Sequence, residues 1–279
     1  MFKGLISHQA FSVAPFKSIF NSIFLFFLIA VKKLIYFPIS INDKKIYGKF
    51  DYLAKGYGGR GIFIFRENYE KLLKFSYKFI KSGDEVLDCG ANQGVFSLIF
   101  SVLNKKGKIF IVEPIRDYNK IIVENLRYNK CYNYKIINEV IADKNKNYYL
   151  DVSYQNVSAS IIKKFGKKKI KVKGSTIDSI LKREKIKKLS FIKLDLEGVE
   201  HLALKGAKNS IKKFKPIICI ETNTKNFKKI ILPQNYKKYK INNSGDLKEV
   251  KKVKKFYDNL FLIHDEVIFS KKYNFKIIK

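Results

Sequence analysis

The 279-residue sequence contains no tryptophan, one methionine and three cysteines. The cysteines, Cys89, Cys131 and Cys219, form no C-x-x-C pair and have no zinc-site spacing. Cys89 and Cys219 lie in apolar runs typical of central strands, so we predict buried free thiols and a reducing cytoplasm. Adjacent residues of a strand point apart, so the run 264–266 (His-Asp-Glu) is no metal cluster and no metal site is predicted.

A hydrophobic run of full membrane-spanning length is also missing. Residues 19–31 are nearly all apolar and are followed by Lys32 and Lys33, but a spanning helix needs roughly 20 apolar residues. No small-x-small cleavage site follows, which argues against a signal peptide. The pattern favours a peripheral helix in the membrane interface, its lysines facing the headgroups of an anionic surface at the inner face of the membrane. An ordinary packed helix and a true span are the alternatives.

Acidic residues are scarce: 24 Asp and Glu stand against 57 Lys and Arg, for a net charge of +33. The basic excess is spread over the chain. It indicates either biased composition or a polyanionic partner, which would be nucleic acid, an anionic membrane surface or an acidic glycan. Apolar residues make up 46% of the chain, which excludes global disorder.

We divide the chain into an apolar and basic helical extension, residues 1–45, and one α/β domain, residues 46–279. The hydrophobic pattern from Lys71 onward is typical of a mostly parallel, Rossmann-like sheet with helices on both faces. Strands are predicted at 85–89, 108–113, 134–142, 147–152, 170–172, 191–195, 217–221 and 259–264, and helices at 72–80, 94–103, 118–128, 176–182 and 199–214. Residues 163–173 are predicted to form a solvated hairpin or loop, and 237–255 shows no clear pattern.

The strongest local signal is the segment 86–94, Val-Leu-Asp-Cys-Gly-Ala-Asn-Gln-Gly, where an apolar strand meets a turn and then a helix. Gly90 and Gly94 would let the backbone pass close beneath a ligand. A dinucleotide-binding turn would need G-x-G-x-x-G facing a pyrophosphate, and Asp88 would repel such a group. A carboxylate suits a ligand with a positive amino group and no phosphate, which describes S-adenosylmethionine.

Glu113 ends the next predicted strand, nineteen residues after Gly94. An acidic side chain at this position can accept hydrogen bonds from both ribose hydroxyls of a nucleoside. The predicted cofactor-binding residues are Asp88, Gly90, Ala91, Asn92, Gly94, Glu113, Pro114 and Asp143. Asp143, just beyond the third strand, is predicted to contact the adenine amino group, although a turn-forming role explains it equally well.

These motifs resemble those of the FkbM-type methyltransferases. The resemblance is carried by the segments 83–94 (GDEVLDCGANQG), 113–114 (EP), 191–200 (FIKLDLEGVE) and 204–207 (LKGA), with further matches at Asn125, Asn129, 158–160 and 176–178. The resemblance covers residues 69–222, and residues 259–263 match more weakly. Cys89 and Gln93 depart from the usual residues without removing a glycine or a carboxylate. The resemblance implies a class I methyltransferase fold and methyl transfer from S-adenosylmethionine to a hydroxyl oxygen, often of a saccharide or a secondary metabolite.

Asp195, Glu197 and Glu200 cluster at the carboxyl end of the fourth central strand, where open α/β sheets bind ligands. Methyl transfer depends mainly on alignment and desolvation, but an alcohol acceptor loses a proton that a nearby carboxylate can take. We predict Asp195 as this base, with Glu197 second. Glu200 is better explained as a helix cap. His201 is a third catalytic candidate, beside the buried stripe of its helix.

The favoured function is therefore O-methylation of a saccharide, glycan or glycolipid-type acceptor. An RNA methyltransferase is favoured by the basic charge, but no RNA-binding module is present and no N-P-P-Y-like tetrapeptide follows Asp195, so nucleic acid is the disfavoured partner. A non-enzymatic, membrane-associated protein that retains the fold is a further alternative, which the intact glycines and carboxylates oppose. A nicotinamide-dependent oxidoreductase is opposed by Asp88.

Overall fold

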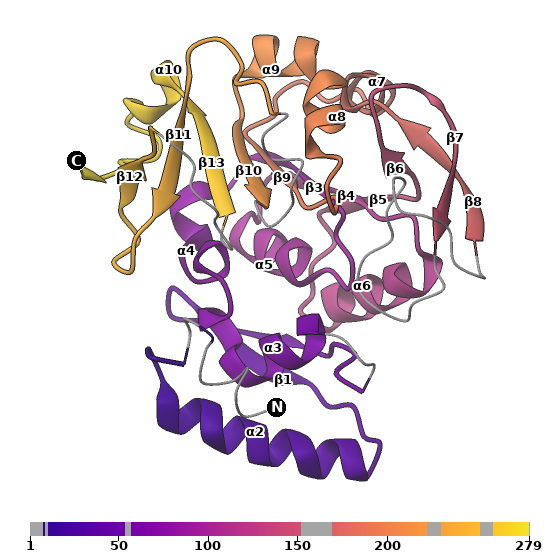
Figure 1. Ribbon diagram of the computed structural model, residues 1–279, viewed down its shortest axis with the longest axis vertical. Coiled ribbons are helices and arrows are strands. Elements are labelled where there is room, and N and C mark those ends of the chain that lie inside the picture. The colour runs from indigo at the N-terminus through magenta and orange to yellow at the C-terminus, as the bar shows by residue number, and fades with distance from the viewer. Residues whose placement is uncertain are drawn as a thin grey trace.

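The computed structural model describes residues 8, 11–53, 57–151, 169–221, 230–251 and 259–278. A nine-stranded sheet forms the centre, in the order β14-β12-β11-β13-β10-β9-β3-β4-β5 (Figure 1). Its five adjacent parallel strands are β10 (Ile217–Glu221), β9 (Phe191–Leu194), β3 (Glu85–Cys89), β4 (Lys108–Val112) and β5 (Tyr134–Ile137). This order confirms the predicted Rossmann-like α/β fold of a class I methyltransferase.

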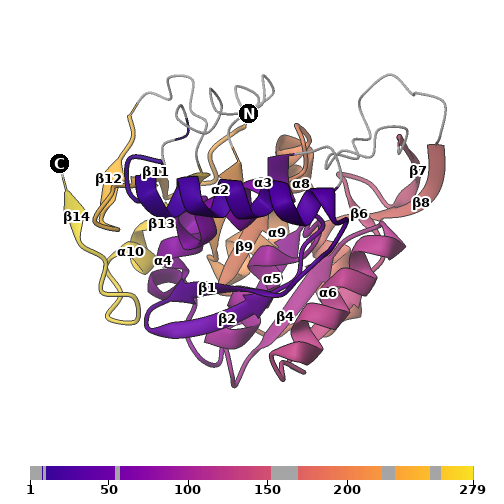
Figure 2. The ribbon, with the colours of Figure 1, turned by 90° about the horizontal axis from the view of Figure 1, so that it is seen from below.

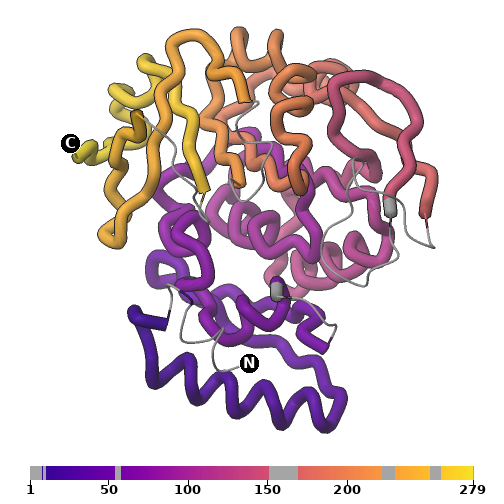
Figure 3. Tube along the Cα trace, in the orientation of Figure 1, coloured from indigo at the N-terminus to yellow at the C-terminus, as the bar shows by residue number. Residues whose placement is uncertain are grey.

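Alternation along the strands divides the core into two apolar clusters, one on each face of the sheet. Val86 and Ile109 belong to one cluster, and their neighbours Leu87 and Phe110 belong to the other. The first cluster includes α4 (Lys71–Phe79), α5 (Val95–Leu103) and α6 (Arg116–Tyr128), and the second includes α7 (Ile177–Arg183), α8 (Glu200–Lys205) and α9 (Lys208–Phe214). Helices therefore cover both faces, as the tube in Figure 3 also shows.

The other end of the sheet is largely antiparallel. There β13 (Asn259–His264) lies between β10 and β11 (Tyr236–Ile241) and runs antiparallel to both. The sheet continues through β12 (Leu247–Glu249) to β14 (Ile277–Ile278). Two strands thus form in the lysine-rich segment whose pattern was unclear. His264 accepts the Glu266 N–H at Nδ1 (3.2 Å) and so caps α10 (Asp265–Ile268).

Two predicted elements are divided in the structure. The strand predicted at 134–142 splits into β5, in the main sheet, and β6 (Val140–Ile141), which pairs with β8 (Lys169–Ser175) beside β7 (Lys146–Asp151). Only 169–173 of the predicted loop 163–173 is described, and it is strand. The helix predicted at 199–214 breaks between α8 and α9, because Asp178 donates its N–H to the carbonyl of Gly206 and its carboxylate caps Ser210.

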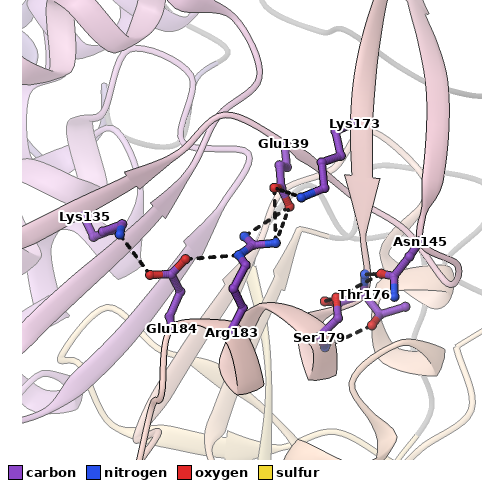
Figure 4. A network of polar contacts seen from close by, with 8 residues as sticks. All are labelled: Lys135, Glu139, Asn145, Lys173, Thr176, Ser179, Arg183 and Glu184. Atoms are coloured by element: carbon purple, nitrogen blue, oxygen red, sulfur yellow. Dashed lines mark hydrogen bonds and ion pairs between the residues drawn. The ribbon is translucent and has the colours of Figure 1, made fainter.

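A network of charged and polar side chains attaches the small sheet to α7 (Figure 4). Glu139 accepts from Lys173 of β8 (2.9 Å) and from Arg183 of α7 (3.2 Å). Arg183 also contacts Glu184, which pairs with Lys135 of β5. A second part of the network joins Asn145 to Thr176 and Ser179 at the start of α7. Together these contacts place the small sheet beside the end of β5.

The N-terminal part of the chain forms α2 (Pro15–Ala30), the hairpin β1 (Phe37–Ile41) and β2 (Lys44–Gly48), α3 (Tyr57–Phe65) and the short η1 (Arg66–Asn68). Phe37, Ile39 and Ile41 are fully buried in the apolar cluster that α4 and α5 share. Asn125 of α6 accepts the Lys49 N–H just after β2 (2.8 Å). The hairpin therefore packs with the α/β domain. Within the described ranges, no helix is long and apolar enough to cross a bilayer.

Candidate active site

The site lies at the carboxyl ends of the parallel strands, where the order in which the chain adds strands to the sheet reverses. From β3 the chain passes to β4 and β5 on one side and returns to β9 on the other, so the carboxyl ends of β3 and β9 meet at a topological switch point. An open cavity of about 100 Å³ lies there, at the place where open α/β sheets bind ligands. Its lining includes Gly90, Asn92, Glu113, Pro114, Tyr118, Glu139, Leu150, Asp195, Leu196 and Glu197.

The turn after β3 requires glycine at two positions. Gly90 has φ +77°, and a Cβ there would lie 2.0 Å from the carbonyl oxygen of Asp195. Gly94 has φ +78° at the start of α5, and a Cβ there would lie 2.5 Å from Ile122. Any side chain would thus separate β3 from β9 or α5 from α6. Because both positions carry glycine, the turn packs closely against β9 and α6 beside the cavity.

Glu113 is a buried carboxylate at the cavity wall. Its Oε2 accepts the N–H of Asn92 and its Oε1 accepts the N–H of Ile115, both at 2.8 Å. Burial raises the pKa of Glu113 to about 7, against the lowering effect of these two hydrogen bonds. Each carboxylate oxygen retains a second lone pair, so the side chain can still accept hydrogen bonds from ligand hydroxyls.

Asp88 lies beneath the turn and is not among the residues that line the cavity. It is fully buried, and its Oδ2 accepts a hydrogen bond from Ser97 (2.6 Å). Asp88 is in register with Lys193 of β9, whose charge opposes the rise that burial causes in the pKa of Asp88. A lysine of the chain itself therefore supplies positive charge near Asp88, and the predicted contact of Asp88 with the amino group of a ligand stays a prediction.

Asp195 borders the cavity at the end of β9. Its Oδ2 pairs with Lys193 Nζ at 2.8 Å, and Lys193 also lies over the Phe96 ring (4.7 Å). Burial would raise the pKa of Asp195, but Lys193 and a hydrogen bond from Glu221 hold it below its ordinary value. Burial and the neighbouring charge of Asp195 raise the pKa of Glu221. Asp195 is thus held ionised and Glu221 protonated.

The remaining predicted residues differ in whether they line the cavity. Glu197 lines the cavity and has φ +54°. Glu200, buried at the start of α8, accepts the N–H groups of Leu196 (2.9 Å) and Gly198 (3.1 Å) through Oε1, and so supports the loop that carries Asp195. The residues outside the cavity lining are Asp88, Ala91, Gly94, Asp143 and His201.

Asp143 pairs with Lys205 (3.5 Å), so the predicted adenine contact has no support in the cavity wall. Residues 158–160, which the resemblance also singled out, lie outside the described residues. Cys89 and Cys219 are free and buried, which confirms the expectation for them, and Cys131 is free and buried as well.

Sequence reasoning missed four polar residues at or near the cavity. Tyr118 and Glu139 line it, and Lys193 and Glu221 control the charge of Asp195. A lysine inside the apolar strand 191–194 was a visible signal, because a buried lysine needs a carboxylate partner. Glu221 ends its strand beside Asp195 in the same way. Tyr118 and Glu139 gave no comparable signal, since neither is unusual for a helix or a turn.

The residues present fit an adenosyl cofactor. Gly90 lets the turn after β3 pack against β9 at the cavity wall, and Glu113 presents hydroxyl-accepting oxygens from the neighbouring strand. This strand order and these two strand ends are those of the class I fold of S-adenosylmethionine-dependent methyltransferases. The chain belongs to the FkbM family of these enzymes, since the Methyltransferase FkbM domain matches residues 88–258. This finding confirms the resemblance drawn from the sequence.

Solved structures similar to the chain are methyltransferases as well. An FkbM methyltransferase from Methylobacillus flagellatus KT shares 17% identity over 74% of this chain and 53% of its own, with a TM-score of 0.44. The chain thus spans about half the length of that protein. An rRNA methylase from Streptococcus thermophilus shares 10% identity over 67% and 89% of the two chains (TM-score 0.41). TrmK from M. capricolum, solved with S-adenosyl-homocysteine, shares 14% over 67% and 63% (TM-score 0.38). No curated protein sequence matches the chain significantly.

Proposed function

We propose that the enzyme transfers a methyl group to a hydroxyl oxygen of a saccharide, glycan or glycolipid-type acceptor. The observation that supports this most directly is the ionised carboxylate of Asp195 at the edge of the cavity. A carboxylate accepts hydrogen bonds only, so it suits an acceptor group that has a proton to donate, as a hydroxyl does. S-adenosylmethionine supplies the electrophilic methyl group when it is bound.

Asp195 is proposed to orient the acceptor hydroxyl and to take its proton. The hydroxyl proton becomes strongly acidic as the oxygen forms its new bond to carbon, so a carboxylate with a lowered pKa is a sufficient base. Lys193 forms an ion pair with Asp195 and Glu221 donates a hydrogen bond to it, and both interactions keep Asp195 ionised. Glu197, which also lines the cavity, is the proposed second contact to the acceptor.

On the cofactor side, Glu113 is proposed to accept the ribose hydroxyls, while the turn at Gly90, Ala91 and Asn92 passes close to the cofactor. Pro114 borders the same cavity directly after Glu113. Asp88 is proposed to act indirectly: its buried carboxylate balances Lys193, and Lys193 in turn keeps Asp195 ionised.

The test is Asp195→Asn, assayed with radiolabelled cofactor against a panel of saccharides and an RNA arm. Turnover per folded molecule should fall by about 10²–10⁴, the usual contribution of a general base. Affinity for S-adenosylhomocysteine should change by less than about 1 kcal/mol, because Asp195 contacts the acceptor rather than the cofactor. Methylation of RNA and of no saccharide would refute the proposed acceptor class.

Two controls make this test specific. Removal of Asp195 leaves Lys193 buried without its nearest partner, which costs stability, so a melting curve must accompany each rate. The double variant Lys193→Met and Asp195→Asn removes this ion pair and lets the buried Asp88 become protonated, so it should recover stability without recovering turnover. Full turnover in a folded Asp195→Asn enzyme would move the base to Glu197 or His201, or show that none is needed.

A further inference from the structure

Helix α2 turns its polar residues toward the protein. Ser18, Asn21 and Ser22 are buried together with Leu25 and Leu28. Their spacing of three, one, three and three residues places them on one side of the helix. This side packs on α3, where Phe24 and Phe63 also come within 6.2 Å of each other.

The inward polar groups are all satisfied. Asn21 Nδ2 donates to the carbonyl of Ile64 (2.8 Å), in the last turn of α3, where carbonyls lack helical partners. Ser18 and Ser22 donate their hydroxyls to the carbonyls of Ala14 and Ser18, each at 2.7 Å. The Asn21 bond to α3 fixes the rotation of α2 about its own axis, with the polar side inward.

The opposite side of α2 is aromatic and exposed. Phe16 is 87%, Phe20 69%, Ile23 61% and Phe27 60% exposed, at a spacing of four, three and four residues along the helix. An ordinary surface helix has the reverse arrangement, with its apolar stripe on the protein. A continuous exposed apolar face of this kind marks an interaction surface. The helix lies at the outer edge of the molecule in Figure 1 and across the side nearest the viewer in Figure 2.

The charge of this region identifies the partner. No aspartate or glutamate precedes Asp43 in the sequence. Lys32 and Lys33 are exposed directly after α2, and Lys17, at its other end, is exposed and contacts Glu67. An apolar face with lysines at both ends matches a bilayer whose headgroups are anionic. In a dimer formed through this face, the lysines of one chain would lie close to the same lysines of the other, and their charges would repel.

We propose that α2 docks on an anionic lipid bilayer, lying in the interface plane with Phe16, Phe20, Ile23 and Phe27 inserted. The lysines at its ends contact the headgroups. With 16 residues the helix is too short to span, and its polar side is already used by α3. The proposal does not depend on the acceptor of the methyl group.

The experiment measures binding of the full-length protein to vesicles of phosphatidylcholine and phosphatidylserine mixed two to one. The double variant Phe20→Ser and Phe27→Ser should bind at least about tenfold more weakly, because two exposed rings no longer enter the bilayer. Its melting temperature should match wild type, since neither ring is buried. The matched control is Ile231→Ser with Phe269→Ser, which removes two side chains that are 86% and 76% exposed elsewhere. The control should bind like wild type.

A second arm separates charge from insertion. Lys32→Gln with Lys33→Gln should weaken binding by about fivefold per lysine on the anionic vesicles, and by less on phosphatidylcholine alone. Equal vesicle binding by wild type and the Phe20/Phe27 variant would overturn the proposal. So would a concentration-dependent dimer without lipid that the same variant abolishes, because the face would then belong to a second copy.

Discussion

Three charged side chains from two adjacent strands define the centre of the site at the residue scale. Asp88 of β3 is in register with Lys193 of β9, and Lys193 is buried and pairs with Asp195, which directly follows β9. Burial alone would lower the pKa of Lys193, but the charges of Asp195 and Asp88 outweigh it and raise the pKa. A buried charge of this kind is tolerated only when it is paired. The group therefore acts as one unit, and a change to any member alters the other two.

Glu113 provides a pH-dependent test at the same scale. Because burial raises its pKa to about 7, the side chain is protonated below that pH and one oxygen becomes a donor. Affinity for S-adenosylhomocysteine should then rise by up to about tenfold from about pH 6 to about pH 8. Glu113→Gln should show a flat profile, and Glu113→Ala should weaken binding by about 1.5–3 kcal/mol at the higher pH. Calorimetry over this range is the measurement; a wild-type profile as flat as that of the Gln variant would contradict the ribose contact.

The loop between β9 and α8 is the decisive segment at the element scale. It carries Asp195 and Glu197, and it includes the left-handed residues Glu197 (φ +54°) and Gly198 (φ +105°). Glu200 stabilises this loop by accepting two of its backbone N–H groups. The first turn of α8 thus positions the proposed catalytic carboxylates without contributing one itself.

Glu200→Ala should lower the free energy of unfolding by about 2 kcal/mol, since it leaves two buried N–H groups without an acceptor. Glu200→Gln is the matched control. Its amide oxygen can still accept, and because burial raises the pKa of Glu200, loss of the charge should cost little. Urea unfolding measures both variants. If the Gln variant were as unstable as the Ala variant, the charge of Glu200 would matter more than its hydrogen bonds.

One apolar cluster joins the N-terminal elements to the α/β domain at the scale of the whole molecule. It includes Leu25 of α2 and Phe37 of β1 together with Phe79 of α4 and Phe261 of β13. The boundary predicted at residue 45 therefore falls inside the β1–β2 hairpin, at a position where the core is continuous. We infer that the hairpin unfolds with the domain.

Truncation tests this continuity. Deletion of residues 1–31 removes α2 but keeps β1, whereas deletion of 1–38 also removes Phe37, which is 1% exposed. The longer deletion should be less stable by about 3–5 kcal/mol, the usual cost of removing a buried phenylalanine. Denaturant unfolding of the two proteins is the measurement. Equal unfolding midpoints for the two deletion proteins would support the boundary predicted at residue 45, with 1–45 as an independent extension.

Local patterns were sufficient to predict most of the sheet and part of the site. The strands β3, β4, β9, β10 and β13 lie within a residue of their predicted ranges, because each is a short apolar run bounded by turn residues. Gly90, Asn92, Glu113 and Asp195 follow such strands directly, and they all line the cavity. The predicted helix at 199–214 was wrong as a single element, because its break depends on Asp178, a distant residue of α7.

The sequence by itself determined the class of fold, the turn after β3 and the carboxylates at the strand ends, since these depend on neighbours in the chain. Only the tertiary structure decided which charges meet. Asp88 is in register with Lys193, more than a hundred residues away, and Asp143 is paired with Lys205 instead of lining the cavity. It also decided the orientation of α2: composition shows an apolar helix with lysines, but its contact with α3 turns the serines inward and leaves the aromatic rings exposed. Such pairings depend on the packing of distant segments, which no local pattern encodes.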